Sequence, residues 1–248
     1  ISAVSWSTTY YPVTQLGFKL KFIDINLGTL NADLDLLRKA INEKTAGILA
    51  VNLLGNPADL VQMREIADIH NIFFIEDNCE SMGAKVGGKF AGTYADIGTF
   101  SSFFSHHIST MEGGMCLTDD LELAQVMTSL RAHGWTRELP PENFVFNKTG
   151  EAFDDLFRFI LPGYNLRPLE LSGAIGKEQL KKLPSLIAGR RENAEKFRAA
   201  FKGKDYLQIQ AENDESSWFG FAMILKGSLA GRRADVVRRL TELGIDSR

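Results

Sequence analysis

Two adjacent histidines, His106 and His107, lie in the stretch FSSFFSHHISTMEGGM, between an aromatic run and Glu112-Gly113-Gly114. The chain has only 4 histidines, so a pair that lies shortly before a glycine turn needs an explanation. An imidazole takes up and releases a proton near neutral pH, because its unperturbed pKa is about 6.5. The stretch therefore predicts acid–base chemistry, unless both rings are hydrogen-bonded members of the core.

Two further candidates close strand-like runs. The acidic pair Glu76-Asp77 ends IFFIED, and Trp6 ends ISAVSW. A carboxylate in this position either contacts a ligand at the end of a strand or caps the following helix. A tryptophan there either faces the same ligand or packs in the core.

The elements that must position these residues alternate along residues 1 to about 120. Apolar runs typical of buried strands, namely ISAVSW, LKFIDI, AGILAVNL and IFFIED, are separated by helical patterns. One helix is predicted after the cap Asp33, and a second has its apolar face at Leu60, Met63, Ile66 and Ala67. This alternation predicts an α/β fold, an open and mostly parallel sheet with helices on both faces. Ligands of such sheets bind beyond the carboxyl ends of the strands.

The rest of the chain predicts a long loop with a short helix over residues 136–163 and a helix from Leu169 to about Ala200. Within that helix, the basic stretch Arg190–Arg198 is expected to be a solvated face. The run WFGFAMIL predicts a strand, and Arg232–Leu243 predicts a helix closed by glycine.

These patterns divide the chain into a large domain over residues 1–168 and a smaller α+β domain over residues 169–248 that includes the linking helix. The chain opens inside a strand-like run without a start methionine. We therefore expect it to be truncated at both ends.

Composition excludes several classes of protein. The net charge of −3 lacks the basic footprint of a nucleic-acid-binding protein. Cys79 and Cys116 are too few for a four-thiolate metal site and are expected to be small core residues. No apolar run has the length of a membrane span, so we expect a cytoplasmic protein without a membrane partner.

The central block IEDNCESMGAKVGGKFAGTYADIGTFSSFFSHHISTMEGGMCLT, with VNLLGNPADL before it and GYNLRPLELSGAIGKEQLKKL after it, resembles the sugar aminotransferases and dehydratases among the fold-type-I pyridoxal-phosphate enzymes. The order of the motifs matches over essentially the whole chain. The resemblance implies a fold-type-I large domain that binds pyridoxal 5'-phosphate or its pyridoxamine form.

In that family, a lysine six residues before the glutamate of E-G-G holds the cofactor covalently. Here that position is His106, and no lysine occurs between Lys89 and Lys148. An imidazole cannot replace a primary amine in that bond, but it can move protons. The lysine-to-histidine exchange resembles 3-dehydratases of nucleotide-linked 4-keto-6-deoxy sugars, in which the untethered pyridoxamine form works with this histidine as acid and base.

The resemblance also implies roles for five other residues. Asp77 would pair with the pyridine nitrogen, Trp6 would stack on the ring, and Ser101 would bind the phosphate. Asn165 would reach the phosphate of a neighbouring subunit, which implies a homodimer with shared active sites. Glu80 would adjoin the ring hydroxyl, at a position where relatives more often have glutamine.

The expected function is C3 dehydration of a nucleotide-linked sugar, with GDP-4-keto-6-deoxy-D-mannose as substrate and glutamate regenerating the pyridoxamine form. Such a reaction belongs to deoxysugar pathways of lipopolysaccharide O-antigens, such as that of colitose. One alternative is an iron–sulfur-dependent CDP-sugar 3-dehydrase, although no cysteine follows Cys116. The other is an inactive aminotransferase-like binding subunit.

Overall fold

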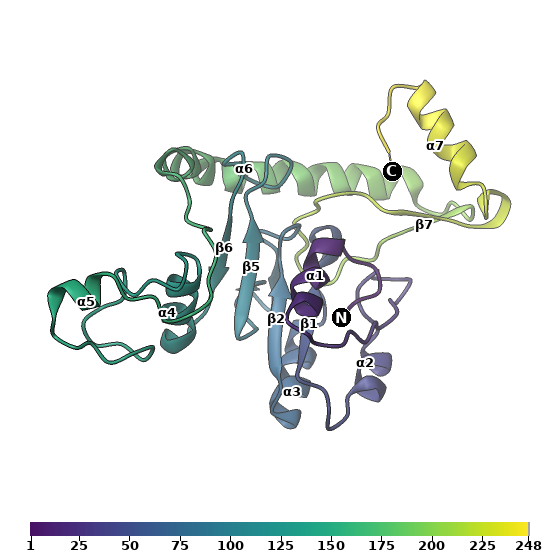
Figure 1. The fold of residues 1–248 in the computed structure, drawn as a ribbon. Coiled ribbons are helices and arrows are strands. Elements are labelled where there is room, and N and C mark those ends of the chain that lie inside the picture. The colour runs from purple at the N-terminus through teal and green to yellow at the C-terminus, as the bar shows by residue number, and fades with distance from the viewer. Residues whose placement is uncertain (248) are drawn as a thin grey trace.

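The computed structural model describes residues 1–247, and at its centre lies a four-stranded sheet in the order β1-β2-β5-β6 (Figure 1). Strands β1 (Gly47–Val51), β2 (Phe73–Asp77) and β5 (Ile97–Ser101) run parallel. Strand β6 (Gly114–Leu117) returns antiparallel to β5. The prediction of an open, mostly parallel sheet is confirmed, and the carboxyl ends of three strands meet at one edge.

Helix α3 (Leu60–His70) packs on β1 and β2 through the apolar face that the sequence predicts. The side chains of this face are all buried: Leu60, Met63, Ile66 and Ala67. They join Ile48, Ala50 and Phe74 from the strands in one core cluster. The helix ends at Asn71, whose left-handed backbone (φ 50°) stops it before β2.

Helix α2 (Leu34–Ala40) begins at the predicted cap, where the Asp33 carboxylate accepts a hydrogen bond from the Leu36 N–H. Only Leu37 of this helix is buried, and it joins the same core.

Two expected strands near the start of the chain are wrong. In ISAVSW only Ser2 pairs, in a single bridge with Ile23, and LKFIDI adds one more bridge, between Ile25 and Ala32. Both pairings are isolated bridges, so these runs form no continuous ladder. Trp6 therefore ends no strand; it is the residue before helix α1 (Ser7–Gln15).

The remaining elements surround this sheet. A small hairpin, β3 (Lys85–Val86) and β4 (Lys89–Phe90), follows β2. Helix α4 (Leu121–Leu130) follows β6, and the short helix α5 (Ala152–Leu156) lies in the predicted long loop. The C-terminal elements are α6 (Glu170–Phe201), β7 (Leu207–Ile209), β8 (Met223–Leu225) and α7 (Arg233–Glu242).

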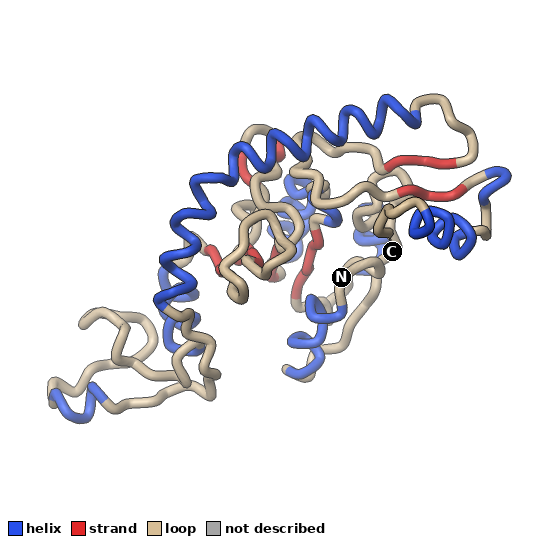
Figure 2. The backbone as a smooth tube through the Cα atoms, turned by 90° about the horizontal axis from the view of Figure 1, so that it is seen from above, coloured by secondary structure: helices blue, strands red, loops and turns tan. Residues whose placement is uncertain are grey.

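The long helix α6 passes along the sheet edge at which the parallel strands end (Figure 1). Its Gly176 lies against Thr110 in the loop after β5, and its Ile187 lies against Gly83 in the loop after β2. The chain between α4 and α6, with α5 at its tip, extends away from the sheet (Figure 2). Among the described residues, no helix combines the length and the apolarity needed to cross a bilayer.

Strand β8 is much shorter than the run WFGFAMIL predicts, because it covers only Met223–Leu225. Trp218 has φ 49°, which is incompatible with an extended strand. Residues 218–221 instead cross the loops at the carboxyl edge of the sheet.

Candidate active site

The loop between β5 and β6, residues 102–113, carries the histidine pair. Hydrogen bonds across its base close it, from the Thr110 N–H to the Ser102 carbonyl (2.8 Å) and from the Ser102 N–H to the Gly113 carbonyl (3.0 Å). The Ser102 and Thr110 hydroxyls are 2.7 Å apart. The Glu112 backbone carbonyl accepts a hydrogen bond from the Thr110 hydroxyl, which holds the turn before β6.

His106 is half-buried at this edge, and its Nδ1 lies 3.0 Å from the Ser101 hydroxyl. Burial lowers the pKa of His106, and the nearby Asp77 carboxylate opposes this shift. A lowered pKa keeps the ring neutral at pH 7. Within residues 1–247 no group hydrogen-bonds its Nε2, which leaves that nitrogen for proton exchange.

Asp77, the last residue of β2, lies at the same edge. Its Oδ2 accepts a hydrogen bond from the Thr9 hydroxyl of α1 (2.7 Å), and its Oδ1 accepts one from the Cys79 N–H (3.0 Å). Burial and the Asp77 charge raise the pKa of the Cys79 thiol, so this thiol stays protonated. The carboxylate is partly exposed and oriented by two donors, as a ligand for a cationic group should be.

Glu76 has a different role from its neighbour, because successive side chains of a strand point to opposite faces. It is fully buried (0%), and its carboxylate accepts hydrogen bonds from the N–H groups of Gly92, Tyr94 and Ala95 at 2.6–2.9 Å. Glu76 therefore fixes the glycine-rich connector before β5, and only Asp77 remains available to a ligand.

Glu80 and Asn52 lie in the neighbouring strand-end loops. Glu80 accepts a hydrogen bond from the Leu54 N–H (2.8 Å). Asn52 is fully buried and donates to the Asn78 side chain (2.6 Å). The side-chain Oδ1 of Asn52 accepts a hydrogen bond from the Ala58 N–H, so Asn52 joins the loops after β1 and β2.

Trp6 and Asn165 are placed differently from one another. Trp6 is 67% exposed and immediately precedes α1, whose Thr9 contacts Asp77, so its ring is free to meet a ligand near that carboxylate. Asn165 pairs with Ala132 and accepts a hydrogen bond from Arg167. Among the described residues, it contacts no other member of the predicted site.

His107 is buried, unlike His106, with 3% of its surface exposed. Its Nε2 lies 3.3 Å from the Ser217 carbonyl. Burial, with a smaller contribution from Arg190, lowers the pKa of His107 to about 4. A ring that remains neutral above pH 4 serves packing rather than proton transfer.

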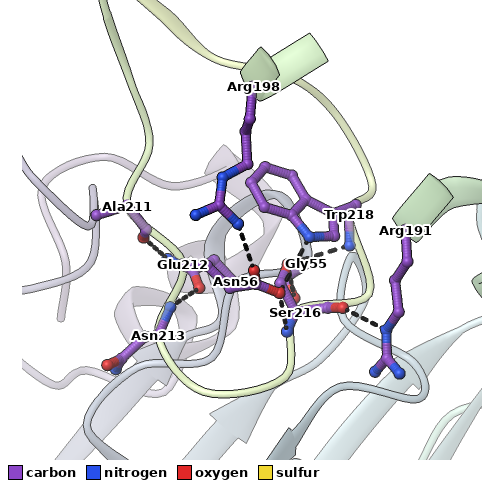
Figure 3. A network of polar contacts seen from close by, with 9 residues as sticks. All are labelled: Gly55, Asn56, Arg191, Arg198, Ala211, Glu212, Asn213, Ser216 and Trp218. Carbon is purple, nitrogen blue, oxygen red and sulfur yellow. Dashed lines mark hydrogen bonds and ion pairs between the residues drawn. The ribbon is translucent and has the colours of Figure 1, made fainter. Parts of the chain in front are cut away.

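The sequence interpretation missed one part of the site, the segment of residues 211–221, and was wrong about the basic face beside it. Arg191 donates to the Ser216 carbonyl, and Arg198 pairs with Glu212 (Figure 3). Arg190 donates to the Trp218 and Phe219 carbonyls. These guanidinium groups hold residues 211–221 over the strand ends instead of forming a solvated face. Cys116, expected in the core, is exposed on β6.

The family model described as "DegT/DnrJ/EryC1/StrS aminotransferase family" matches residues 1–248. The chain is 57% identical over 249 residues to GDP-4-keto-6-deoxy-D-mannose 3-dehydratase of Yersinia pseudotuberculosis, covering 100% of this chain and 63% of that protein. The chain thus spans less than two thirds of the length of this relative.

Two solved structures superpose closely. A structure of E. coli GDP-4-keto-6-deoxy-D-mannose-3-dehydratase with bound hydrated PLP has a TM-score of 0.96 and 52% identity, covering 100% of this chain and 64% of that one. A GDP-4-keto-6-deoxymannose-3-dehydratase structure with a trapped PLP-glutamate geminal diamine has the same TM-score, identity and coverage. The chain belongs to the DegT/DnrJ/EryC1/StrS aminotransferase family, and its α/β fold is that of the fold-type-I enzymes.

Proposed function

We propose that this chain forms the cofactor-binding and catalytic part of a 3-dehydratase of nucleotide-linked 4-keto-6-deoxy sugars. The names of the similar proteins favour GDP-4-keto-6-deoxy-D-mannose as the substrate. The observation that carries the proposal is His106, a half-buried imidazole with a free Nε2 where the family has a lysine. Its charge partner Asp77 lies at the same edge.

The residues at the strand ends fit pyridoxamine 5'-phosphate by the chemistry of their side chains. Asp77 offers an oriented anionic oxygen to a protonated pyridine nitrogen, and the exposed Trp6 offers an aromatic face. The Ser101 hydroxyl, at the end of β5, is available to a phosphate oxygen as well as to His106. When bound, the cofactor supplies a primary amine for the 4-keto group and a ring that accepts electrons.

His106 then provides the proton transfer that elimination needs. With the cofactor bound, the neutral ring would accept at Nε2 a proton released from a carbon of the cofactor and deliver the same proton to the C3 hydroxyl. The electron pair left by that C–H bond would break the C3–O bond, and the oxygen would leave as water. Ser101 serves either tautomer, because a hydroxyl can donate to Nδ1 or accept from it. Without an amine at this position, no side chain here competes for the aldehyde form of the cofactor.

Assembly and the amino donor are part of the same proposal. We infer a cytoplasmic homodimer in which Asn165 of each subunit reaches the phosphate in the other. Within one chain Asn165 pairs with Ala132 and Arg167, and among the described residues no hydrogen bond joins it to Asp77 or His106. Glutamate would restore the pyridoxamine form, as the PLP-glutamate adduct in the related dehydratase suggests.

The test is to incubate the protein with pyridoxal phosphate, glutamate and several 4-keto-6-deoxy nucleotide sugars, and to identify products by mass spectrometry. We expect a 3-deoxy sugar from the GDP-linked substrate, together with 2-oxoglutarate. An aminated sugar that keeps its C3 oxygen would contradict the proposal. Formation of neither product would favour the inactive binding subunit.

A further inference from the structure

One aromatic ring, Phe219, contacts both histidines of the catalytic loop from a segment more than a hundred residues away. Its ring stacks on His106, with centroids 5.4 Å apart and planes at 23°. It lies 5.8 Å from the ring of His107 at 36°. The Arg190 guanidinium is 5.7 Å from the same Phe219 centroid. Phe219 therefore connects the α6 helix with the histidine loop.

The backbone of Phe219 is held on both sides. Its N–H donates to the Leu54 carbonyl (2.9 Å), and the Ser217 N–H donates to the Gly55 carbonyl (2.9 Å). From α6, Arg190 donates to the Phe219 carbonyl at 2.9 Å. These bonds fix the backbone of the segment between the loop after β1 and the long helix, and from this position the ring of Phe219 stacks on His106.

The close approach of the two backbones requires glycine at position 55. Gly55 has φ 89°, and a Cβ there would lie 2.7 Å from the backbone nitrogens of Trp218 and Phe219. The facing residues Leu54 (φ 57°) and Trp218 (φ 49°) both adopt left-handed conformations without being glycine. Strained backbone of this kind persists only where surrounding contacts over-determine it, and it is enriched at functional sites.

Those surrounding contacts form the polar network of Figure 3. The Trp218 N–H donates to the Ser216 hydroxyl (3.1 Å), and the indole N–H donates to Glu212 (3.1 Å). Glu212 also pairs with Arg198 (2.8 Å). A segment that is held by this many bonds at one strained turn delivers the next side chain, Phe219, to a defined position.

We infer that Phe219 is a positioning residue for His106, an inference that rests on the proposed function. The phenyl ring sets the plane of the imidazole, and the Ser101 hydroxyl sets its rotation, so that Nε2 points in one direction. Proton transfer depends steeply on such alignment, since a displacement of about 1 Å can cost about 10²-fold in rate.

The test uses the full-length protein with three substitutions. Phe219→Leu removes the stacking surface, Phe219→Tyr keeps it, and Phe221→Leu is the matched control, because Phe221 packs on Phe197 and Trp218 and on neither histidine. Carbethoxylation of His106 by diethylpyrocarbonate, followed by peptide mass spectrometry, reports the freedom of the ring without any turnover. Turnover of the GDP-linked sugar gives kcat and KM.

In Phe219→Leu, we expect faster modification of His106 and a kcat lower by about 10- to 100-fold, with KM little changed. The acidic limb of the kcat–pH profile should move upward as the ring gains water; the charged or titratable groups around it are Asp77, His107 and, beyond Phe219, Arg190. Phe219→Tyr and Phe221→Leu should match the unaltered protein. Unchanged His106 reactivity in Phe219→Leu would overturn the inference.

Gly55→Ala tests the same link from the opposite side, because it displaces the segment without touching either ring. It should raise His106 reactivity as Phe219→Leu does, and failure to do so in folded protein would count against the inference. Faster modification in both variants, with no turnover by the unaltered protein, would contradict the proposed function and leave the positioning role standing.

Discussion

Two regions of the molecule differ in whether their side chains find partners within the same chain. At the strand-end site, formed by Asp77, Ser101 and His106, each predicted side chain has a partner from the same chain. In the outer segment, residues 144–171, apolar side chains instead lie exposed. They are Phe144, Phe153, Leu156, Phe157, Phe159, Tyr164, Leu166, Leu169 and Leu171.

This difference indicates which surface a second subunit would cover in the proposed dimer. A run of large exposed apolar side chains is typical of a surface that another protein covers. The outer segment extends from the sheet (Figure 2) and contains Asn165, the residue expected to reach a neighbouring site. Under the proposed function, proton transfer would use residues within one chain, and closure of the site would use the proposed dimer.

The largest expected effect is at the centre of the strand-end site. His106→Asn should lower dehydration by about 10²- to 10⁴-fold, because an amide cannot transfer a proton. Binding of pyridoxamine phosphate, measured by fluorescence titration, should stay near its original affinity. The control is His70→Asn at the exposed end of α3, which should be fully active. Full activity in His106→Asn would refute the assignment.

The next effect tests the outer segment. Leu166→Glu combined with Leu169→Glu should raise the dimer dissociation constant by roughly 10²-fold, because two charges would enter a desolvated interface. Light scattering measures the assembly, and circular dichroism checks the fold. Ile69→Glu, equally exposed but on α3, is the matched control and should remain dimeric. If the double variant stays dimeric, the outer segment is not the interface.

A smaller effect concerns stability against pH. Burial holds the pKa of folded His107 at about 4, whereas an unfolded histidine titrates near 6.5. As the pH falls below 6.5, His107 binds a proton in the unfolded state but not in the folded state. The free energy of unfolding therefore decreases. The loss from this group at pH 5 is about 2 kcal/mol. Urea unfolding at pH 7 and pH 5 should show this component in the unaltered protein and not in His107→Gln.

The smallest expected effect concerns Asn165, a residue of the outer segment that would act at the strand-end site of the other subunit. Asn165→Ala should reduce activity about tenfold, since one phosphate hydrogen bond is lost. Mixing this variant with His106→Asn under subunit exchange should recover part of the activity, because a mixed dimer would contain one site with both residues intact. No recovery above the sum of the separate variants would mean that each site is built from a single chain.

Local sequence patterns were enough to predict the central helices and strands. The capped helix α2, the apolar face of α3 and the strands β1 and β2 follow from residue spacing alone. His106 and Asp77 lie at the same edge of the sheet, where an open α/β sheet is expected to bind its ligand, while their roles toward a cofactor stay predictions.

The contacts that the sequence could not give are long-range. Phe219 reaches the histidine loop from the segment of residues 211–221, and Arg190 reaches Phe219 from α6. No local spacing encodes either contact. Trp218 reads as strand because it is aromatic, yet tertiary hydrogen bonds hold it at φ 49°. ISAVSW failed as a strand for a related reason, since β propensity does not provide a ladder partner.

The buried carboxylate of Glu76 also acts as a register lock. If β2 slipped by one residue against its neighbours, Asp77 would enter the core and Glu76 would swing outward, away from three backbone amides. Such a misaligned sheet would leave those donors unpaired, so the folding chain is strongly biased against it. Asp77, the acid proposed to bind the cofactor, is thus kept at the sheet edge by its buried neighbour Glu76.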